Sequence, residues 1–122
     1  IFGMGETIKD RDDFLYSLKS LNPTTVPINF YHPHPSLSLT NNVIDIHTAF
    51  SLIKKTKEIV NPRVLMIAGG REITFQDKQY EIFNFGANAI VIGDYLTTSG
   101  YEVSKDILNL QKLGYTIAKN CD

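Results

Sequence analysis

The stretch that decides the fold reads Val64-Leu65-Met66-Ile67-Ala68-Gly69-Gly70-Arg71-Glu72. Its first five residues form a compact apolar run, as expected of a parallel strand that is covered on both faces. Two glycines then interrupt the run, and two charged residues follow. A strand that ends in a glycine turn is typical of α/β folds, in which ligands bind at the carboxyl ends of parallel strands.

Three further stretches repeat this design of a strand end followed by a helical pattern. They are Ile1-Phe2-Gly3-Met4-Gly5-Glu6-Thr7, Val26-Pro27-Ile28-Asn29-Phe30 and Gly93-Asp94-Tyr95-Leu96-Thr97-Thr98. We therefore predict an α/β fold of about four parallel strands that alternate with helices. Four such units amount to the C-terminal half of a (β/α)8 barrel, spanning residues 1–122, with the N-terminal half absent. A half-barrel has two unpaired edges and should dimerise or exchange partners, and a small open sandwich is the alternative.

Hydrophobic periodicity and capping residues predict the helices. The first runs from about Lys9 to Leu21 after the capping box Thr7-Ile8-Lys9-Asp10, and its buried face carries Phe14, Leu15, Leu18 and Leu21. The second is capped by Asp45 and ends at Asn61-Pro62. A third is expected from about Asp77 to Phe85, closed by Gly86, and a fourth has Val103, Ile107 and Leu110 on one face and ends at Gly114.

The predicted strands are short. They cover residues 26–30, 64–68 and 89–92, with a stub of an earlier strand at Ile1-Phe2. The loop from Tyr31 to Asn42 is punctuated by prolines and should lack regular structure. Such a length is unusual for a loop between a strand and a helix, and long loops are often functional.

The composition is that of an ordinary globular protein. Hydrophobic residues make up 43% and charged residues 20% of the 122 residues, and the formal net charge is −1. This balance argues against nucleic-acid binding and against a basic membrane patch. We also expect no membrane span and no signal peptide, because no long apolar block occurs. The single Cys121 excludes a disulfide within the chain and favours a cytoplasmic location.

Two of the strand ends carry candidate ligand-binding groups. In Gly3-Met4-Gly5-Glu6 the glycines let the backbone approach a ligand and expose its N–H groups, or they only permit a tight turn. Asn29 alternates with Ile28 and Phe30, so its amide should point away from the helices and into the barrel. That amide could donate to and accept from a polar ligand, or it could be satisfied by the backbone.

Other candidates are more ambiguous. Arg71 could grip a carboxylate or phosphate at the rim, or it could pair with Glu72. Asp94 at the next strand end has the same two interpretations. The run His32-Pro33-His34-Pro35 lacks the spacing of a zinc site, so we predict no metal site there. Cys121 has no nearby partner and is interpreted as inert.

Together, the four motifs resemble the C-terminal half of the biotin synthase family, in the region shared by biotin and thiamine synthesis enzymes of the radical SAM class. The strongest parts are Pro27-Ile28-Asn29-Phe30, Ala68-Gly69-Gly70-Arg71-Glu72 and Gly93-Asp94-Tyr95-Leu96-Thr97-Thr98. The resemblance implies a (β/α)8 barrel and a homodimer. It also implies that the parent enzyme cleaves S-adenosylmethionine at a [4Fe-4S] cluster and inserts sulfur from a [2Fe-2S] cluster into dethiobiotin.

The resemblance assigns roles to individual residues. Gly3, Met4, Gly5 and Glu6 match the family's turn near S-adenosylmethionine, and His32 corresponds to a loop near the adenosine. Asn29 matches a residue that contacts dethiobiotin. Arg71 and Asp94 are candidate rim contacts.

The chain departs from the family in two respects. It lacks the Cys-x3-Cys-x2-Cys motif and the other cluster cysteines, so this chain alone should hold no metal and be catalytically inactive. Many members place an arginine that ligates the [2Fe-2S] cluster where this chain has Met66, which puts that ligation in doubt. The alternatives are another radical SAM lyase, of the thiamine or hydrogenase-maturation type, and a non-catalytic binding or assembly fragment.

Overall fold

The computed structural model describes residues 1–39, 43–96 and 98–120. The chain divides into two compact units, residues 1–90 and residues 91–122. The first unit contains the sheet and most of the helices. The second contains a loop and one helix.

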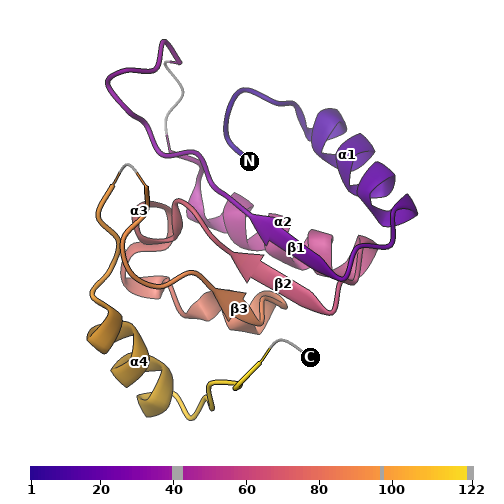
Figure 1. Cartoon of the computed structure of the whole chain (residues 1–122). Coiled ribbons are helices and arrows are strands. Elements are labelled where there is room, and N and C mark those ends of the chain that lie inside the picture. The colour runs from indigo at the N-terminus through magenta and orange to yellow at the C-terminus, as the bar shows by residue number, and fades with distance from the viewer. Residues whose placement is uncertain (40–42, 97, 121–122) are drawn as a thin grey trace. The chain divides into compact units, whose positions relative to one another are not determined.

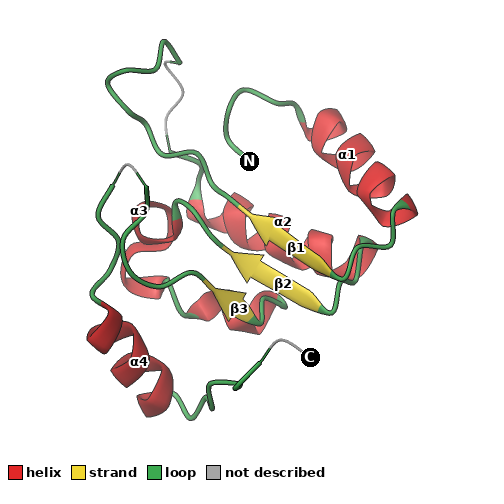
Figure 2. Ribbon diagram, viewed as in Figure 1, coloured by secondary structure: helices red, strands yellow, loops and turns green. Residues whose placement is uncertain are grey.

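The first unit is built around a parallel sheet (Figures 1 and 2). Its strands β1 (Thr25–Ile28), β2 (Val64–Ile67) and β3 (Ala89–Ile90) are neighbours in chain order. Beside β1, Phe2 forms an isolated parallel bridge with Phe30, which confirms the predicted strand stub at the start of the chain. The parallel α/β arrangement predicted from the sequence is therefore confirmed, while the half-barrel stays a prediction.

The helices of this unit gather around the longest of them, which lies behind one face of the sheet. The α-helices are α1 (Ile8–Ser20), α2 (Ile46–Ile59) and the short α3 (Arg71–Phe75), followed by two 3-10 helices, η1 (Gln76–Lys78) and η2 (Glu81–Phe85). Helix α2 lies behind the strands in Figure 2 and contacts α1, α3 and η2. Its cap is Asp45, as predicted, whose side chain accepts hydrogen bonds from the N–H groups of His47 and Thr48.

Strand alternation separates a helix-facing side of the sheet from an opposite side. Val26, Ile28, Leu65 and Ile67 are buried in the hydrophobic core with residues of α2. The opposite side carries the row Pro27, Met66 and Ala89, which the register places side by side. Pro27 is exposed, and Met66 and Ala89 are half-buried. The predicted alternation of β1 is thus confirmed.

Pro27 sits in β1 without disturbing its ladder to β2. Every second residue of this segment bonds to β2. Val64 N–H donates to the Thr24 carbonyl, and Ala68 N–H donates to the Ile28 carbonyl. The ring nitrogen of Pro27 therefore faces the other edge of β1, where a missing N–H removes no bond to β2.

The region from Arg71 to Phe85 differs from the prediction of one helix over residues 77–85. Helix α3 begins earlier and ends at Phe75, because the next residue, Gln76, has a φ of +50° that is incompatible with a continuing helix. Two 3-10 turns follow, in a segment rich in aromatic residues that are weak helix formers. The predicted cap is correct, because Gly86 adopts the left-handed conformation after η2.

Two predicted core residues of α1 are exposed. Leu15 is buried, but Phe14 is 55% and Leu21 75% exposed. Phe14 lines an apolar groove of about 190 Å³ between α1 and β1, together with Leu18 and Pro27. The cause is position, since α1 flanks the sheet beside β1 and packs only its inner face on α2.

The second unit contains α4 (Val103–Lys112), which Gly114 follows in the left-handed conformation, as predicted. Leu110 is buried, Ile107 half-buried and Val103 exposed. The predicted strand over residues 89–92 is only two residues long, so Val91 and Ile92 belong to the loop that precedes α4. Within the described ranges, none of the helices combines the length and apolar character that crossing a bilayer requires.

Candidate functional site

Three of the four sequence motifs meet at the carboxyl ends of neighbouring parallel strands. Phe2 N–H donates to the Asn29 carbonyl and Tyr31 N–H to the Phe2 carbonyl, each at 2.8 Å. Phe30 N–H in turn donates to the Gly69 carbonyl at 2.8 Å. These bonds bring the turn after Phe2, the end of β1 and the turn after β2 to one edge of the sheet. Ligands bind at this edge in barrels and open α/β sheets.

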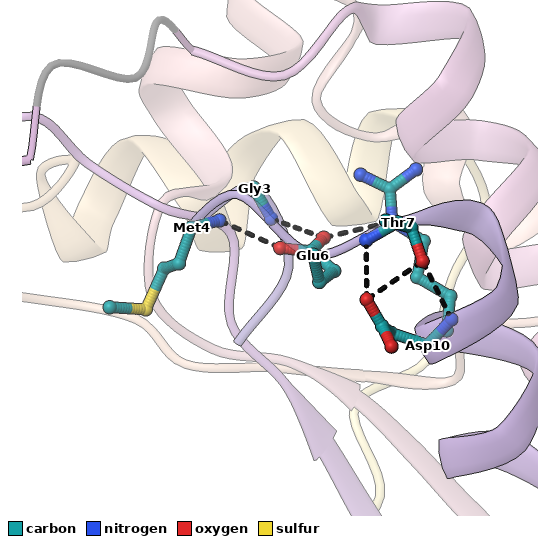
Figure 3. Close-up of polar contacts among 6 residues, drawn as sticks. Gly3, Met4, Glu6, Thr7 and Asp10 are labelled. Atoms are coloured by element: carbon teal, nitrogen blue, oxygen red, sulfur yellow. Dashed lines mark hydrogen bonds and ion pairs between the residues drawn. The ribbon is translucent and has the colours of Figure 1, made fainter.

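The turn after Phe2 is closed by its own glutamate (Figure 3). One oxygen of Glu6 accepts the Gly3 N–H at 2.7 Å, and the other accepts the Met4 N–H at 2.8 Å. The Arg11 Nε, from the first turns of α1, donates to the first oxygen at 2.8 Å. Of the two interpretations of this turn, these bonds support the tight turn, and the ligand-binding role of its residues stays a prediction.

The charge state of Glu6 follows from these bonds. Partial burial on its own would raise the pKa of Glu6. Hydrogen bonds from the Gly3 N–H, the Arg11 side chain and the N–H groups of Glu6 and Met4 outweigh that effect, so the pKa lies below its ordinary value. The carboxylate is therefore the stable form of Glu6 at neutral pH.

The predicted capping box fixes the start of α1 immediately after this turn. The Asp10 N–H donates to the Thr7 hydroxyl, and the Thr7 N–H donates back to the Asp10 carboxylate at 2.8 Å. The backbone bond from Thr7, followed by the bond from its hydroxyl, lowers the pKa of Asp10. Reciprocal bonds of this kind satisfy two otherwise free donors and orient the helix relative to the turn.

Asn29 follows β1 directly and is not part of the core that holds its neighbours Ile28 and Phe30, as the alternation predicts. Its Oδ1 accepts the Gly69 N–H at 2.8 Å, and a Cβ at Gly69 would lie only 2.9 Å from that oxygen. The backbone therefore satisfies the acceptor of this amide. Among the described residues, the Nδ2 group has no hydrogen-bond partner, so Asn29 retains its donor hydrogens for a ligand.

The turn after β2 approaches β1 closely through Gly70. This residue has a φ of +80°, and a Cβ there would lie 2.2 Å from the Phe30 carbonyl oxygen. Only glycine fits both the backbone conformation and the contact. Gly70 is therefore required for packing between two strand ends.

Arg71 is turned into the protein and does not form a rim. Its side chain is 0% exposed, and its Nη1 donates to Gln79 at 2.6 Å. Its Nη2 pairs with Glu72 at 3.2 Å, and its guanidinium lies over the ring of Tyr80. Of the two interpretations of Arg71, the structure supports pairing with Glu72 and places no part of the side chain where a ligand could reach it.

The remaining candidates are not among the residues that these hydrogen bonds join. His32 is exposed in the loop after β1. Asp94 belongs to the second unit, where its carboxylate accepts the Gly100 N–H at 3.1 Å and closes a loop. In the part of the chain that the structure describes, no group of three or more His, Cys, Asp or Glu side chains could hold a metal ion. Thr97 and Cys121 lie outside the described residues.

The sequence did not identify Arg11 and Gln79 as the hydrogen-bond partners of Glu6 and Arg71. A signal for Arg11 exists, because a basic residue near a helix N-terminus opposes the helix dipole unless an acid pairs with it. Gln79 has no such signal, since its role depends on the path of the chain through two 3-10 turns.

The groups at this edge of the sheet are suited to binding a ligand. Asn29 offers an amide donor, Met4 an apolar side chain that is 41% exposed, and Gly5 a backbone without a side chain. These groups fit a polar but uncharged part of a ligand. They do not fit an iron–sulfur cluster, which needs several thiolates, because the chain has one cysteine.

This chain is similar to known proteins along its whole length. Residues 27–116 match the family of Biotin and Thiamin Synthesis associated domains. The whole chain is 50% identical over 123 residues to a biotin synthase of Sulfurovum sp., covering 43% of that protein. Biotin synthases of Campylobacter lari and Aliarcobacter butzleri are 47% and 48% identical, over 99% of this chain and 44% and 43% of theirs. The chain thus spans less than half the length of these relatives.

Proposed function

The chain belongs to the family of Biotin and Thiamin Synthesis associated domains, and from that premise we propose that it works as the C-terminal part of a biotin synthase. The parent enzyme would convert dethiobiotin to biotin by radical SAM chemistry. The observation that carries this proposal is the 50% identity to a biotin synthase along the whole chain.

We propose that Asn29 contacts dethiobiotin. Its amide lies at the carboxyl end of β1, outside the core that holds Ile28 and Phe30, and its Nδ2 hydrogens have no partner among the described residues. Dethiobiotin presents an uncharged urea-type carbonyl, which an amide N–H can recognise. The bond from Gly69 to Oδ1 supports this role, because it fixes the amide so that Nδ2 is the group left to bind.

S-adenosylmethionine would lie near the turn of Gly3, Met4, Gly5 and Glu6, with His32 on the neighbouring loop. The exposed Met4 side chain and the bare backbone of Gly5 fit an uncharged part of that cofactor. When bound to a [4Fe-4S] cluster in the parent, the cofactor supplies the radical that abstracts hydrogen, and a [2Fe-2S] cluster supplies sulfur. This chain's residues bind and orient, and they shield the reaction from water.

Two candidate rim residues receive different roles. Arg71 is a structural residue in this proposal, because it is fully buried. Asp94 stays a candidate rim contact, because its carboxylate is exposed in the second unit. The half-barrel, the homodimer and the cytoplasmic location are part of the same proposal. So is the inactivity of this chain on its own, which follows from its lack of cluster thiolates.

A chimera tests the proposal. The matched region of the Sulfurovum biotin synthase is replaced by this chain, and the purified, cluster-loaded protein is assayed for biotin formed from dethiobiotin. We expect activity from the chimera and none from this chain alone. A chimera that folds and carries its clusters but forms no biotin would contradict the proposed function.

Substitution of Asn29 in the chimera separates its structural role from its ligand role. Asn29→Asp keeps the acceptor for Gly69 but loses the donor, so we expect unchanged stability and dethiobiotin binding weakened about tenfold or more. The matched control is Asn84→Asp, at an exposed position, which should change neither. Equal dethiobiotin affinities for the Asn29→Asp protein and the parent chimera would rule out the assigned role. Protection of the chimera by tyrosine instead of dethiobiotin would favour the lyase alternative.

A further inference from the structure

We infer that Glu6 is a positioning residue, a resident anion that fixes the Gly3–Glu6 turn and closes its N–H groups to external anions. Only the identity of the ligand near the turn rests on the proposed function. The hydrogen-bond geometry of the turn carries the inference on its own.

The geometry is that of an occupied anion site. Gly3 and Gly5 have φ values of +98° and +105°, and successive N–H groups in such a turn converge on one point. The Glu6 carboxylate lies at that point and accepts from Gly3 and Met4 through its two oxygens (Figure 3). A residue of the turn itself therefore supplies the anion that such a site otherwise takes from solution.

Arg11 holds the carboxylate in this position from the helix. Its bond to Glu6 joins the turn to α1, and only 15% of the Arg11 side chain and 20% of the Glu6 side chain are exposed. On the other side, Gly3 packs against Tyr31, since a Cβ at Gly3 would lie 3.3 Å from the Tyr31 Cβ. Glu6 thereby aligns the turn with the end of β1, where Asn29 lies two residues before Tyr31.

Two consequences follow for ligand binding. An anionic group has no free donor at Gly3 or Met4, so these two N–H groups do not recognise a phosphate or a carboxylate. The turn does present a fixed surface of Met4 and Gly5 beside β1. A ligand that contacts it does so through an uncharged part, and the contact depends on Glu6 only through the shape of the turn.

Chemical rescue tests this inference in the 122-residue chain. Glu6→Ala removes the anion but leaves both N–H groups and Arg11. We expect the amide resonances of Gly3 and Met4 to shift and their hydrogen exchange to become about tenfold faster, as for the loss of one such bond. Added acetate should then bind the vacated site, reverse both changes and saturate. In the unsubstituted chain, acetate should leave these two amides unchanged.

Matched variants guard against a general effect on folding. Asp13→Ala removes one carboxylate from the exposed Lys9–Asp13 pair on the same helix and should leave both amides unchanged. If Glu6→Ala does not fold, Glu6→Gln retains one acceptor oxygen and should release one of the two amides. Amides of Gly3 and Met4 that do not respond to either Glu6 substitution would overturn the inference. Acetate binding of equal strength with and without Glu6 would do the same.

The chimera extends the test to the proposed ligand. There, Glu6→Ala should weaken S-adenosylmethionine binding about tenfold and leave dethiobiotin binding unchanged, and acetate should restore part of the loss. A merely structural defect would weaken both ligands and would not respond to acetate. If the chimera with Glu6 intact binds no S-adenosylmethionine, the proposed function fails, whereas the amide rescue still decides the role of Glu6.

Discussion

Two glycine turns follow the strand stub at Phe2 and strand β2, which lie on either side of β1, and the two turns are closed in opposite ways. The turn at Gly3–Glu6 lies near the surface, and an acid within the turn fills it. The turn at Gly69–Arg71 is packed against the end of β1, with Gly70 beside the Phe30 carbonyl. Each turn also has a neighbouring arginine. Arg11 is half-buried on its glutamate, while Arg71 is fully buried on Gln79 and Glu72.

The difference shows that a glycine turn at a strand end need not offer its backbone to a ligand. Both turns have the composition of a phosphate or carboxylate site, and in both the protein itself engages backbone donors. Glu6 accepts the N–H groups of Gly3 and Met4, and Asn29 accepts the Gly69 N–H. Among the described residues, the Nδ2 group of Asn29 between the two turns has no hydrogen-bond partner. In our proposal, ligand binding at this edge therefore depends on Asn29, the residue after β1, with the two turns as its supports.

The largest expected effect is at Gly70. Gly70→Ala would place a Cβ 2.2 Å from the Phe30 carbonyl oxygen and force alanine into the left-handed region, so we expect at least about 3 kcal/mol of destabilisation or no folded protein. Urea denaturation measures the effect. The control is Gly114→Ala, which has a similar φ of +84° and nothing within 4 Å, and should lose only about 1 kcal/mol. Equal losses of stability at the two sites would mean that Gly70 is needed only for its positive φ and not for its contact with Phe30.

Replacing Arg71 should destabilise the protein more than replacing Arg11. Arg71→Met leaves the buried oxygen of Gln79 without its donor, and we expect a loss of about 2–3 kcal/mol in the free energy of unfolding. Arg11→Met leaves Glu6 with its two backbone donors, and we expect a loss of about 1 kcal/mol. Denaturation curves of both variants against the parent chain provide the measurement. A larger loss at Arg11 would reverse the contrast between a packed turn and a surface turn.

The smallest effect is the pH dependence contributed by Glu6. Its pKa is lowered in the folded state, so its stabilisation is present above the unfolded value of about 4.3 and is lost as the pH falls through the lower folded value. The stability difference between the parent chain and Glu6→Gln should therefore shrink in acid. Asp10, Asp45 and Glu102 have lowered pKa values too, so only this difference isolates Glu6. A difference that stays constant into acid would argue against the carboxylate as the resident anion.

Local signals in the sequence were sufficient for much of the fold. Asp45, Gly86 and Gly114 were identified as caps because their roles depend on adjacent backbone groups, and the structure confirms all three. The alternation of β1 likewise predicted that Ile28 and Phe30 face the core and Asn29 does not. These features follow from the periods of strands and helices, which the sequence displays directly.

The contacts that close the two turns could not be predicted in the same way. The bond from Gly69 to Asn29 joins residues forty positions apart, and the contact of Gly70 with Phe30 spans the same distance. Even the short-range fold of Glu6 onto Gly3 depends on φ angles that glycine permits but does not dictate. A motif therefore indicated where the polar groups gather, but only the coordinates show which of them are already engaged.

Pro27 has a consequence for the backbone pairing that the outer edge of β1 can offer. The edge of β1 beyond the Phe2 bridge runs past the proline nitrogen, so a foreign strand seeking to extend the sheet there meets a position that cannot donate. Exposed sheet edges are templates for aggregation, and a proline in an edge strand is one way in which proteins prevent it. Replacing Pro27 by another residue would add one backbone N–H donor to that edge.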